Sequence, residues 1–315
     1  MSLPLVIINP ASAGGATGDA WPRLASSLRT HFGAFNCAFT ERAGDATLIA
    51  AREAEAGRRF IIACGGDGTI SEVANGILRS GARAELGVLP SGTGGDFRRT
   101  LRISEGANEA ARELREGQTR RMDVGRVTFI NQEGEEESRY FLNVASLGMG
   151  GAVVERVKEN PLAWLPANAS RVLGGRVVFA AAALQTTLTF KQPTVEIQID
   201  DRPAFRLRLT NLCVANAQYF GGGMKVAPNA KLNDGLLDII SIGDLSQLGI
   251  LANSYRIYLG THLGMQKVKH RRAKRLTAHS ADPDETVRLE IDGELAGRLP
   301  ATFQVVPDAL LLRSP

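Results

Sequence analysis

A glycine-rich turn with a single carboxylate interrupts the stretch FIIACGGDGTISEV, residues 60–73. An apolar run ends there and a helical pattern begins at once. Glycines after a strand let the backbone turn tightly and let a ligand approach the amides. A helix that follows directs free N–H groups and the positive end of its dipole at the turn, which favours an anion. Asp67 would repel a bare phosphate, so its presence makes sense if Mg²⁺ accompanies the phosphate.

The helix after this turn has a clear apolar face, and its first residues match a capping pattern. Apolar residues from Ile70 to Leu78 recur at helical spacing. Thr69 and Glu72 have the spacing of a capping box. Taken alone, the turn is equally compatible with an ordinary strand–helix connection in which Asp67 caps the helix.

Two further loops favour a ligand site. GVLPSGTGGDFRRT, residues 87–100, again passes from an apolar strand into glycines and one carboxylate, Asp96. IINPASAGG, residues 7–15, ends another strand at Asn9. Loops that follow parallel strands meet at one edge of the sheet. Three such loops suggest a cradle for a nucleoside triphosphate, although the standard G-x-x-x-x-G-K-[ST] loop is absent and no lysine follows these glycines.

Short apolar runs alternate with helical patterns over the first 125 or so residues. The predicted strands are 3–8, 36–40, 59–64, 85–90 and 122–127, and the predicted helices are 19–31, 45–56, 69–80 and 106–116. This alternation predicts an α/β domain with a parallel sheet and flanking helices.

The pattern changes in the second half of the chain. We expect a hairpin with an acidic tip at 130–146, a helical stretch at about 151–188 and then mainly short β runs. The second half is therefore predicted to be mostly antiparallel β. We place the domains at 1–127 and 128–302, and the closing strands, about 303–315, could return to the first domain.

Composition sets limits on these alternatives. The chain has 315 residues, of which 44% are hydrophobic and 22% charged, as in a globular protein with a sizeable core. A net charge of +4 neither demands nor excludes an anionic partner. Three scattered cysteines without a C-x-x-C suit a reducing compartment and argue against disulfides or a zinc ribbon. The four histidines are scattered and form no visible metal cluster.

The N-terminus and the longest apolar run both indicate that any membrane contact is peripheral. The N-terminus has no basic segment before its short apolar run, so we expect a first strand and not a signal peptide. The longest apolar run, 177–190, is shorter than the about 20 residues of a spanning helix and contains Gln185. It is expected to form a core or interfacial helix.

Together these motifs resemble the diacylglycerol kinase catalytic-domain superfamily, and most closely its bacterial soluble lipid kinases. The resemblance covers nearly the whole chain. It is carried by NPASAGG, GGDGTISEV, PSGTGGDF, YFGGGMKVAPNAKLNDGLLDI (219–239) and LEIDGE (289–294). The second glycine loop usually has Asn before its Asp, and here that residue is Gly95. NAD kinases have the same G-G-D-G turn and the same two-domain plan, so the expected fold is also NAD kinase-like. The downstream segments favour the lipid kinases.

The resemblance implies a set of nucleotide and metal contacts. ATP would contact Asn9, Thr40, Gly65, Gly66, Asp67, Gly68, Thr69, Ile70, Ser71, Glu72, Gly92, Thr93, Gly94 and Asp96. Asp67, together with Asp96, would organise the Mg²⁺ bound to the nucleotide. A second, structural Mg²⁺ would be held by the carbonyls of Lys231 and Leu236 and the carboxylate of Asp234. N-D-G is also a β-turn signal, and a turn can direct its carbonyls at an ion.

The D-G-E element supplies the general base in the family. We carry that role to Asp292, with Glu294 as a supporting or alternative base. From the residues alone, EIDGE is simply a turn that ends a strand. A carboxylate beside the acceptor hydroxyl can take its proton as the bond to phosphorus forms. Positioning and charge neutralisation would supply most of the acceleration.

KVKHRRAKR, residues 267–275, is the strongest basic run. A solvated strand face is the simpler explanation. In a strand, Lys267, Lys269 and Arg271 would lie on one side, and with Arg272 they could contact anionic lipid. Binding of nucleic acid is less favoured, because no aromatic residues alternate with the charges.

These observations predict an ATP- and Mg²⁺-dependent lipid kinase in the cytoplasm, peripherally associated with the membrane. Diacylglycerol is the default acceptor by resemblance, but phosphatidylglycerol, sphingoid bases and long-chain alcohols share its hydroxyl and alkyl tail. An NAD kinase-like phosphotransferase is the alternative enzyme. A non-catalytic nucleotide- or lipid-binding regulator is the other alternative, and Gly95 favours it. Exposed edge strands could also pair in a homodimer.

Overall fold

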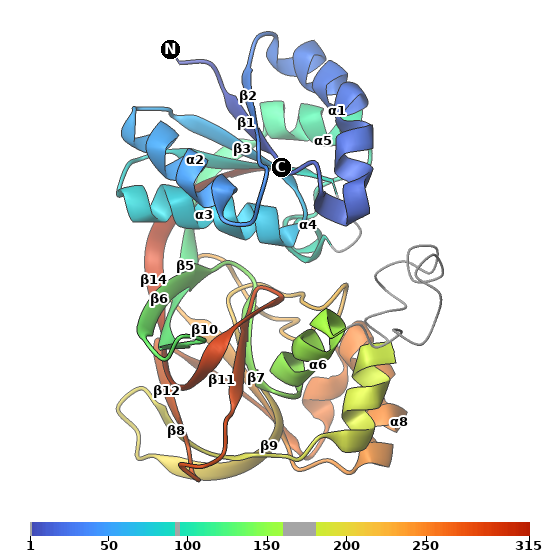
Figure 1. Ribbon diagram of the computed structural model, residues 1–315, viewed down its shortest axis with the longest axis vertical. Helices are drawn as coiled ribbons and strands as arrows, with labels where there is room; N and C mark the ends of the chain where they lie inside the picture. Colours follow the sequence, from blue (N-terminus) through green and yellow to red (C-terminus); the bar gives the residue numbers. More distant parts are fainter. Residues whose placement is uncertain (1, 92–94, 160–180) are drawn as a thin grey trace. The chain divides into compact units, whose positions relative to one another are not determined.

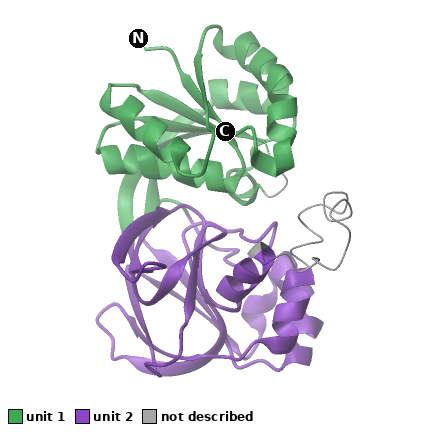
Figure 2. Ribbon diagram, viewed as in Figure 1, with its two compact units in different colours: residues 1–124, 232–235, 306–315 green, residues 125–231, 236–305 purple. Residues whose placement is uncertain are grey.

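The chain divides into two compact units, each described here by itself (Figure 2). The computed structural model describes residues 2–91, 95–159 and 181–315. Unit 1 consists of Met1–Val124, Leu232–Gly235 and Val306–Pro315, and unit 2 consists of Gly125–Lys231 and Leu236–Val305. Two segments from late in the chain therefore belong with the N-terminal residues.

Unit 1 is built on a parallel sheet. Its strands are β1 (Leu5–Ile8), β2 (Asn36–Phe39), β3 (Phe60–Gly65) and β4 (Glu85–Pro90), joined in the order β4-β3-β1-β2. The far edge of β4 pairs in parallel with the end of β14 (Glu294–Ser314). These apolar strands are largely buried, except β2 at the edge, as expected for a sheet covered on both faces.

Helices flank this sheet on different sides of the strands (Figure 1). They are α1 (Ala16–Phe32), α2 (Asp45–Glu55), α3 (Asp67–Ser80), α4 (Asp96–Leu101) and α5 (Ala107–Glu116), with a short 3₁₀ turn at Ser12–Gly15. Helix α1 packs with α5, and α2 packs with α3. Gly76 makes the second pair possible, because a Cβ there would collide with the main-chain oxygen of Thr47.

Unit 2 is mainly antiparallel. Its central order is β11-β10-β9-β7-β13-β14, while β8 and β12 form a second path between β9 and β14, and β5 and β6 form a hairpin. The strands not yet given are β5 (Gln118–Asn131), β6 (Glu136–Phe141), β7 (Val144–Gly148), β8 (Thr194–Ile199), β9 (Phe205–Ala215), β10 (Leu237–Gly243), β11 (Val268–Ala273), β12 (Arg275–Ser280) and β13 (Arg288–Ile291). The helices are α6 (Met149–Lys158), residues 181–189, α8 (Gln247–Leu259) and a 3₁₀ turn at His262–Gly264.

Two apolar clusters lie on opposite faces of the strands of unit 2. Leu212 and Ile239 belong to the larger cluster, whereas their chain neighbours Cys213 and Ile240 belong to the smaller one. Successive side chains of a strand point to opposite faces, so both faces of β9 and β10 are covered. The predicted fold class, an α/β domain followed by a mainly antiparallel β domain, is confirmed.

Several elements differ from their predicted limits. Residues 122–127 were expected to extend the parallel sheet, but they belong to β5, which pairs antiparallel with β6 through a tight turn. Helix α3 begins at Asp67, two positions before the predicted start at 69. The predicted helical stretch 151–188 is helical at its two described ends, and 160–180 lies outside the described residues.

Candidate active site

Three loops at the strand ends of unit 1 are joined by side-chain hydrogen bonds. Asn9 Nδ2 donates to Thr69 Oγ1 at 3.1 Å, which links the ends of β1 and β3. The Gly66 N–H donates to Ser12 Oγ at 2.9 Å. Thr17 Oγ1 donates to the carbonyl of Ser91, just after β4, at 2.9 Å. The loops that sequence patterns placed at one edge of the sheet are therefore in contact there.

The first glycine turn is tightly packed and leaves the start of α3 uncapped. A Cβ on Gly65 would come within 2.6 Å of Thr69 Oγ1, and one on Gly66 within 3.2 Å of Ser12 Oγ. Gly66 is the N-cap of α3, and as a glycine it has no side chain to accept a hydrogen bond from the first turn. Uncapped N–H groups and the helix dipole favour a phosphate or carboxylate at this position.

Asp67 joins the first glycine loop to the second. Its Oδ2 accepts from the Asp96 N–H and its Oδ1 from the Phe97 N–H, both at 3.0 Å. Asp67 therefore binds the two main-chain N–H groups at the start of α4. Asp96 is itself buried, and its Oδ1 lies 3.1 Å from Arg99 Nη1. Carboxylate oxygens are the donors that a hard cation such as Mg²⁺ prefers, so Asp67 and Asp96 fit the predicted nucleotide-bound ion in chemistry.

The departure at Gly95 fits the backbone. Gly95 is the N-cap of α4 and has φ of 63°, in the left-handed region. Glycine adopts this region freely, and asparagine is the other residue that visits it readily. The exchange of the family's Asn for Gly95 therefore preserves the turn that places Asp96. The predicted contacts Gly92, Thr93 and Gly94 lie outside the described residues.

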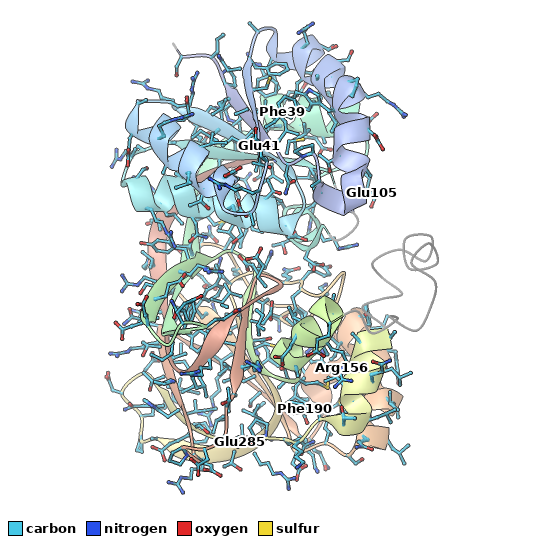
Figure 3. The ribbon with its side chains drawn as sticks, viewed as in Figure 1. Phe39, Glu41, Glu105, Arg156, Phe190 and Glu285 are labelled. Carbon is cyan, nitrogen blue, oxygen red and sulfur yellow. The ribbon has the colours of Figure 1, made fainter. Side chains whose placement is uncertain are left out.

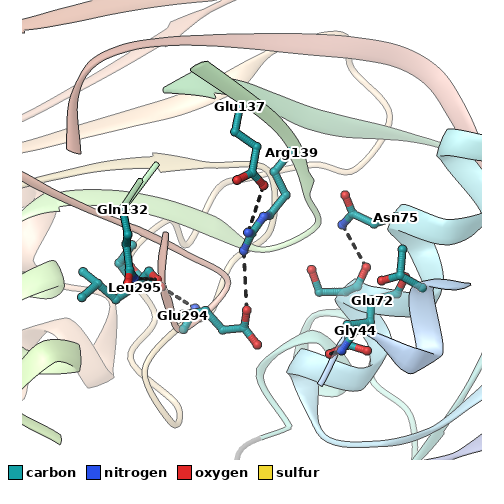
Figure 4. A network of polar contacts seen from close by, with 12 residues as sticks. Gly44, Glu72, Asn75, Gln132, Glu137, Arg139, Glu294 and Leu295 are labelled. Atoms are coloured by element: carbon teal, nitrogen blue, oxygen red, sulfur yellow. Dashed lines mark hydrogen bonds and ion pairs between the residues drawn. The ribbon is translucent and has the colours of Figure 1, made fainter. Parts of the chain in front are cut away.

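The predicted capping box is wrong. Thr69 lies inside α3, whose N-cap is Gly66, and Glu72 accepts from the N–H groups of Gly44 at 3.0 Å and Ala46 at 3.2 Å (Figure 4). Thr69 instead accepts from Asn9. The reason is tertiary: the N-terminus of α2 lies against α3 and supplies N–H donors for Glu72. Glu72 thus fixes the loop that follows β2.

Three more of the predicted nucleotide residues, Thr40, Ile70 and Ser71, have defined positions in unit 1. Thr40 is buried just after β2, and its N–H donates to the Ile8 carbonyl at 2.9 Å, which places it at the same edge of the sheet. Ile70 is 1% exposed and packs in the core, so only its main chain is available to a ligand. The Ser71 carbonyl accepts from Asn75 Nδ2 at 2.9 Å.

Asp123 is a functional candidate that sequence patterns missed. It is 2% exposed, and its Oδ2 accepts from the Gly235 N–H at 2.7 Å, while its Oδ1 accepts from the Asp308 N–H at 2.9 Å. Its own N–H donates to the Leu232 carbonyl at 2.6 Å. One buried carboxylate therefore holds the 232–235 turn and a bend in β14. The signal was a lone acid inside the apolar run MDVGRV.

The predicted structural metal site lies on the turn that Asp123 holds. Lys231, Asp234 and Leu236 lie on the turn that leads directly into β10, and Gly235 has φ of 70°. Carbonyl and carboxylate oxygens fit Mg²⁺ in chemistry. Among the described residues there is no cluster of three His, Cys, Asp or Glu side chains suited to a metal. An ion here would depend on main-chain oxygens, and its assignment stays a prediction.

The carboxylates of the EIDGE turn in unit 2 have different surroundings. Asp292, at φ of 48°, accepts from the N–H groups of Leu142 and Asn143 at 2.9 Å and Val144 at 3.2 Å. Glu290 is 2% exposed and accepts from Ser146 Oγ at 2.6 Å and from the Gly293 N–H. Both carboxylates are thus engaged in holding the turn.

Glu294 projects from this turn toward solvent. Its side chain is 55% exposed and pairs with Arg139 at 3.6 Å (Figure 4). Arg139 also pairs with Glu137 at 3.1 Å and lies 6.0 Å from the Phe129 ring centre. Of the three acids in the turn, Glu294 has the most accessible carboxylate. Sequence patterns gave no indication of Arg139 or Glu290.

Most of the basic run of residues 267–275 lies on β11, an edge strand, and its last residue, Arg275, begins β12. Lys269, Arg271 and Arg272 are exposed. Lys269 lies opposite Ser241 and Arg271 opposite Ile239, so both share a face with the larger apolar cluster, whereas Val268 belongs to the smaller one. Lys267 Nζ donates to the Asp244 carbonyl.

Comparison with known proteins identifies the family. Residues 4–127 match the family described as Diacylglycerol kinase catalytic domain, and residues 161–313 match the YegS C-terminal NAD kinase beta sandwich-like domain. A diacylglycerol kinase of Staphylococcus saprophyticus is 32% identical over 273 residues, covering 84% of this chain and 79% of the relative. The chain belongs to the diacylglycerol kinase family. The predicted enzyme class, a diacylglycerol kinase-like lipid kinase, is thereby confirmed.

Other members of the diacylglycerol kinase family agree. A diacylglycerol kinase of Bacillus subtilis (strain 168) is 30% identical over 265 residues, covering 84% of this chain and 80% of the relative. The crystal structure of a protein from Bacillus anthracis str. Sterne is 26% identical in sequence, with a TM-score of 0.76. The match covers 100% of this chain and 95% of the Bacillus anthracis chain.

No described helix has both the length and the apolar character needed to cross a bilayer.

Proposed function

We propose that this member of the diacylglycerol kinase family transfers the γ-phosphoryl group of ATP to a lipid hydroxyl, with diacylglycerol as the default acceptor. The observation that carries the proposal is the interlocked set of three strand-end loops around the uncapped start of α3. Such loops bind phosphates through main-chain N–H groups. The acceptor assignment follows the relatives named above, and a reaction at a membrane surface follows from the acceptor.

In this proposal, one carboxylate of the EIDGE turn acts as the general base. The acceptor oxygen attacks the γ-phosphorus, the bond from that phosphorus to the bridging oxygen breaks, and ADP leaves. The acceptor proton passes to a carboxylate. Asp292 and Glu290 already accept main-chain and hydroxyl hydrogen bonds, so the contacts favour Glu294 as the base.

Asp67 and Asp96 are the residues that would hold Mg²⁺ with the nucleotide. The ion, when bound, neutralises charge on the phosphates. Asp67 also keeps the second glycine loop against the first, so its contribution to positioning does not depend on the ion. Asn9 and Thr69 support the same edge of the sheet.

Label transfer from γ-labelled ATP tests the proposal. Wild type, Glu294→Gln and Asp292→Asn are incubated with Mg²⁺ and either mixed-micelle lipids, including diacylglycerol and phosphatidylglycerol, or soluble NAD. We expect label in one lipid class and a loss in Glu294→Gln. Label in NAD alone would overturn the lipid acceptor. ATP binding without transfer to any acceptor would favour a regulator.

A further inference from the structure

Helix α8 carries an exposed row of large apolar side chains. Leu248, Leu251, Tyr255, Tyr258 and Leu259 are 79%, 39%, 54%, 51% and 66% exposed. They recur at the spacing i, i+3, i+7, i+10 and i+11, so they share one face of the helix. Soluble surfaces rarely keep a contiguous apolar row of this size without a use for it.

A second helix extends this row. Gln247 Nε2, at the start of α8, donates to the Leu188 carbonyl at 2.8 Å, which brings residues 181–189 beside α8 (Figure 1). Leu188 is 55% exposed. Figure 3 places Arg156 and Phe190 in the same region, and Arg156 Nη2 donates to Thr189 Oγ1 at 3.4 Å. The α8 surface is defined here as Leu188, Leu248, Leu251, Tyr255, Tyr258 and Leu259.

The opposite side of α8 is firmly attached, so the exposure is not that of a detached helix. Ile257 packs against the smaller apolar cluster, which contains Ile240 and Val268. The Lys225 N–H donates to the Ile257 carbonyl at 3.0 Å. Ser246 caps the helix by accepting from the Gly249 N–H at 3.1 Å. A helix held at both ends and along one side presents its other face as a fixed surface.

Cations outnumber acids beside the α8 surface. Lys191, Arg208, Lys225, Arg256 and Lys267 lie on or near α8, and the acids found beside its start are Asp244, Asp282 and Glu285. Arg256 lies on α8 itself. Lys267 Nζ donates to the carbonyl of Asp244, which lies just before the start of α8. The acid of Asp244 is paired with Arg208 at 3.6 Å. The helical residues 181–189 carry no charge at all.

This combination fits an anionic bilayer. Leucines enter the boundary of the acyl chains, tyrosines suit the headgroup level, and nearby cations attract anionic lipids. We propose that the α8 surface is the face by which this chain docks on an anionic lipid bilayer. The inference rests on the proposed function, because a kinase with a membrane-resident acceptor must reach the bilayer. The excess of cations favours lipid over a second copy of the chain, which would carry the same charge.

Vesicle sedimentation without ATP tests the docking surface. The double variant Leu248→Gln/Leu259→Gln is compared with wild type and with Leu48→Gln, whose leucine is 67% exposed on α2 of unit 1. Vesicles contain phosphatidylcholine with or without phosphatidylglycerol. We expect the double variant to bind mixed vesicles about tenfold or more weakly, because two apolar side chains no longer leave water on docking. Leu48→Gln should bind like wild type, and all three should unfold at the same urea concentration.

A second readout separates this inference from the kinase assignment. Label transfer is measured to dioctanoylglycerol dissolved as monomers and to diacylglycerol embedded in vesicles. The double variant should keep the wild-type rate on the dissolved acceptor and lose rate on the embedded one. Wild type that labels neither acceptor, yet binds vesicles through Leu248 and Leu259, would refute the kinase function and support the docking surface.

Two outcomes would overturn the docking surface. One is binding of the double variant to mixed vesicles with wild-type affinity. The other is a change from dimer to monomer in sedimentation velocity with vesicle binding unchanged, since a second copy of the chain would then cover α8.

Discussion

The carboxylate of Asp67 accepts a hydrogen bond from the main-chain N–H of Asp96 at 3.0 Å. This contact, with its companion to Phe97, joins two glycine loops that lie on different strands. The acid that looked like a metal ligand from its position in a glycine turn is therefore also the residue that holds the second loop in place.

Replacing Asp67 by Asn should weaken both stability and nucleotide binding. An amide has one acceptor oxygen, so one of the two N–H groups at the start of α4 would face an NH₂ group. A part-buried donor left without a partner costs about 1–3 kcal/mol. Urea unfolding and calorimetric titration with ATP measure the two effects. Asp45→Asn is the control, because a single oxygen of Asp45, Oδ2, accepts from the N–H groups of both Glu41 and Arg42, so an amide can keep both bonds. It should lose less stability than Asp67→Asn and keep its affinity for ATP.

Glu294 and Asp292 should separate activity from stability. Glu294→Gln changes an exposed side chain, so its free energy of unfolding should stay within about 0.5 kcal/mol of wild type, whereas kcat should fall about 10²- to 10⁴-fold if it is the base. Asp292→Asn disturbs three main-chain hydrogen bonds and should lower stability by about 1–3 kcal/mol. A stable, inactive Asp292→Asn beside an active Glu294→Gln would reverse the assignment.

Glu290 and Ser146 should act as one unit. The buried Glu290 accepts from Ser146 Oγ and the Gly293 N–H, and so fixes the turn that carries Glu294. We expect Glu290→Gln to lower kcat while leaving the KM for ATP unchanged, because the nucleotide loops are not touched. In a double-mutant cycle with Ser146→Ala, the losses of stability should be non-additive by about 0.5–3 kcal/mol. Additive losses would show that the two side chains act independently.

The stability of unit 2 should depend on pH through His262. Burial lowers the pKa of His262 from 6.5 in the folded chain, and its Nε2 contacts the Val226 carbonyl at 2.9 Å. Above pH 6.5 both folded and unfolded chains hold it neutral, so its contribution is fully present. As pH falls below that value, the unfolded chain binds a proton that the folded chain does not, and stability drops by up to about 1.4 kcal/mol per pH unit.

Urea unfolding at several pH values between 7.5 and 5 checks this dependence. His262→Gln should be less stable at neutral pH but should lose less stability on acidification than wild type. His279→Gln, at an exposed position on β12, controls for the loss of a histidine. An acid dependence of His262→Gln as steep as that of wild type would contradict the role of His262.

The sequence was informative where local chemistry decides structure. The glycines and apolar runs predicted that the loops after β1, β3 and β4 lie together, because the carboxyl ends of parallel strands lie at the same edge of a sheet. The partners of individual carboxylates were not predictable in this way. Glu72 has capping-box spacing, yet its partners are 26 and 28 positions away. Asp123 and Glu290 bind groups more than a hundred positions distant, and such pairings depend on the register of strands that only the folded chain defines.

Strand β14 makes the last residues of the chain a part of the first unit to be synthesised. Leu311 to Arg313 pair with β4, so residues 1–127 expressed alone would leave β4 as an open edge, and open edges invite aggregation. On the ribosome, β4 gains this neighbour only after residues 311–313, which are made long after β4, have emerged. The order in which the chain is made and the order in which its parts are completed are therefore different.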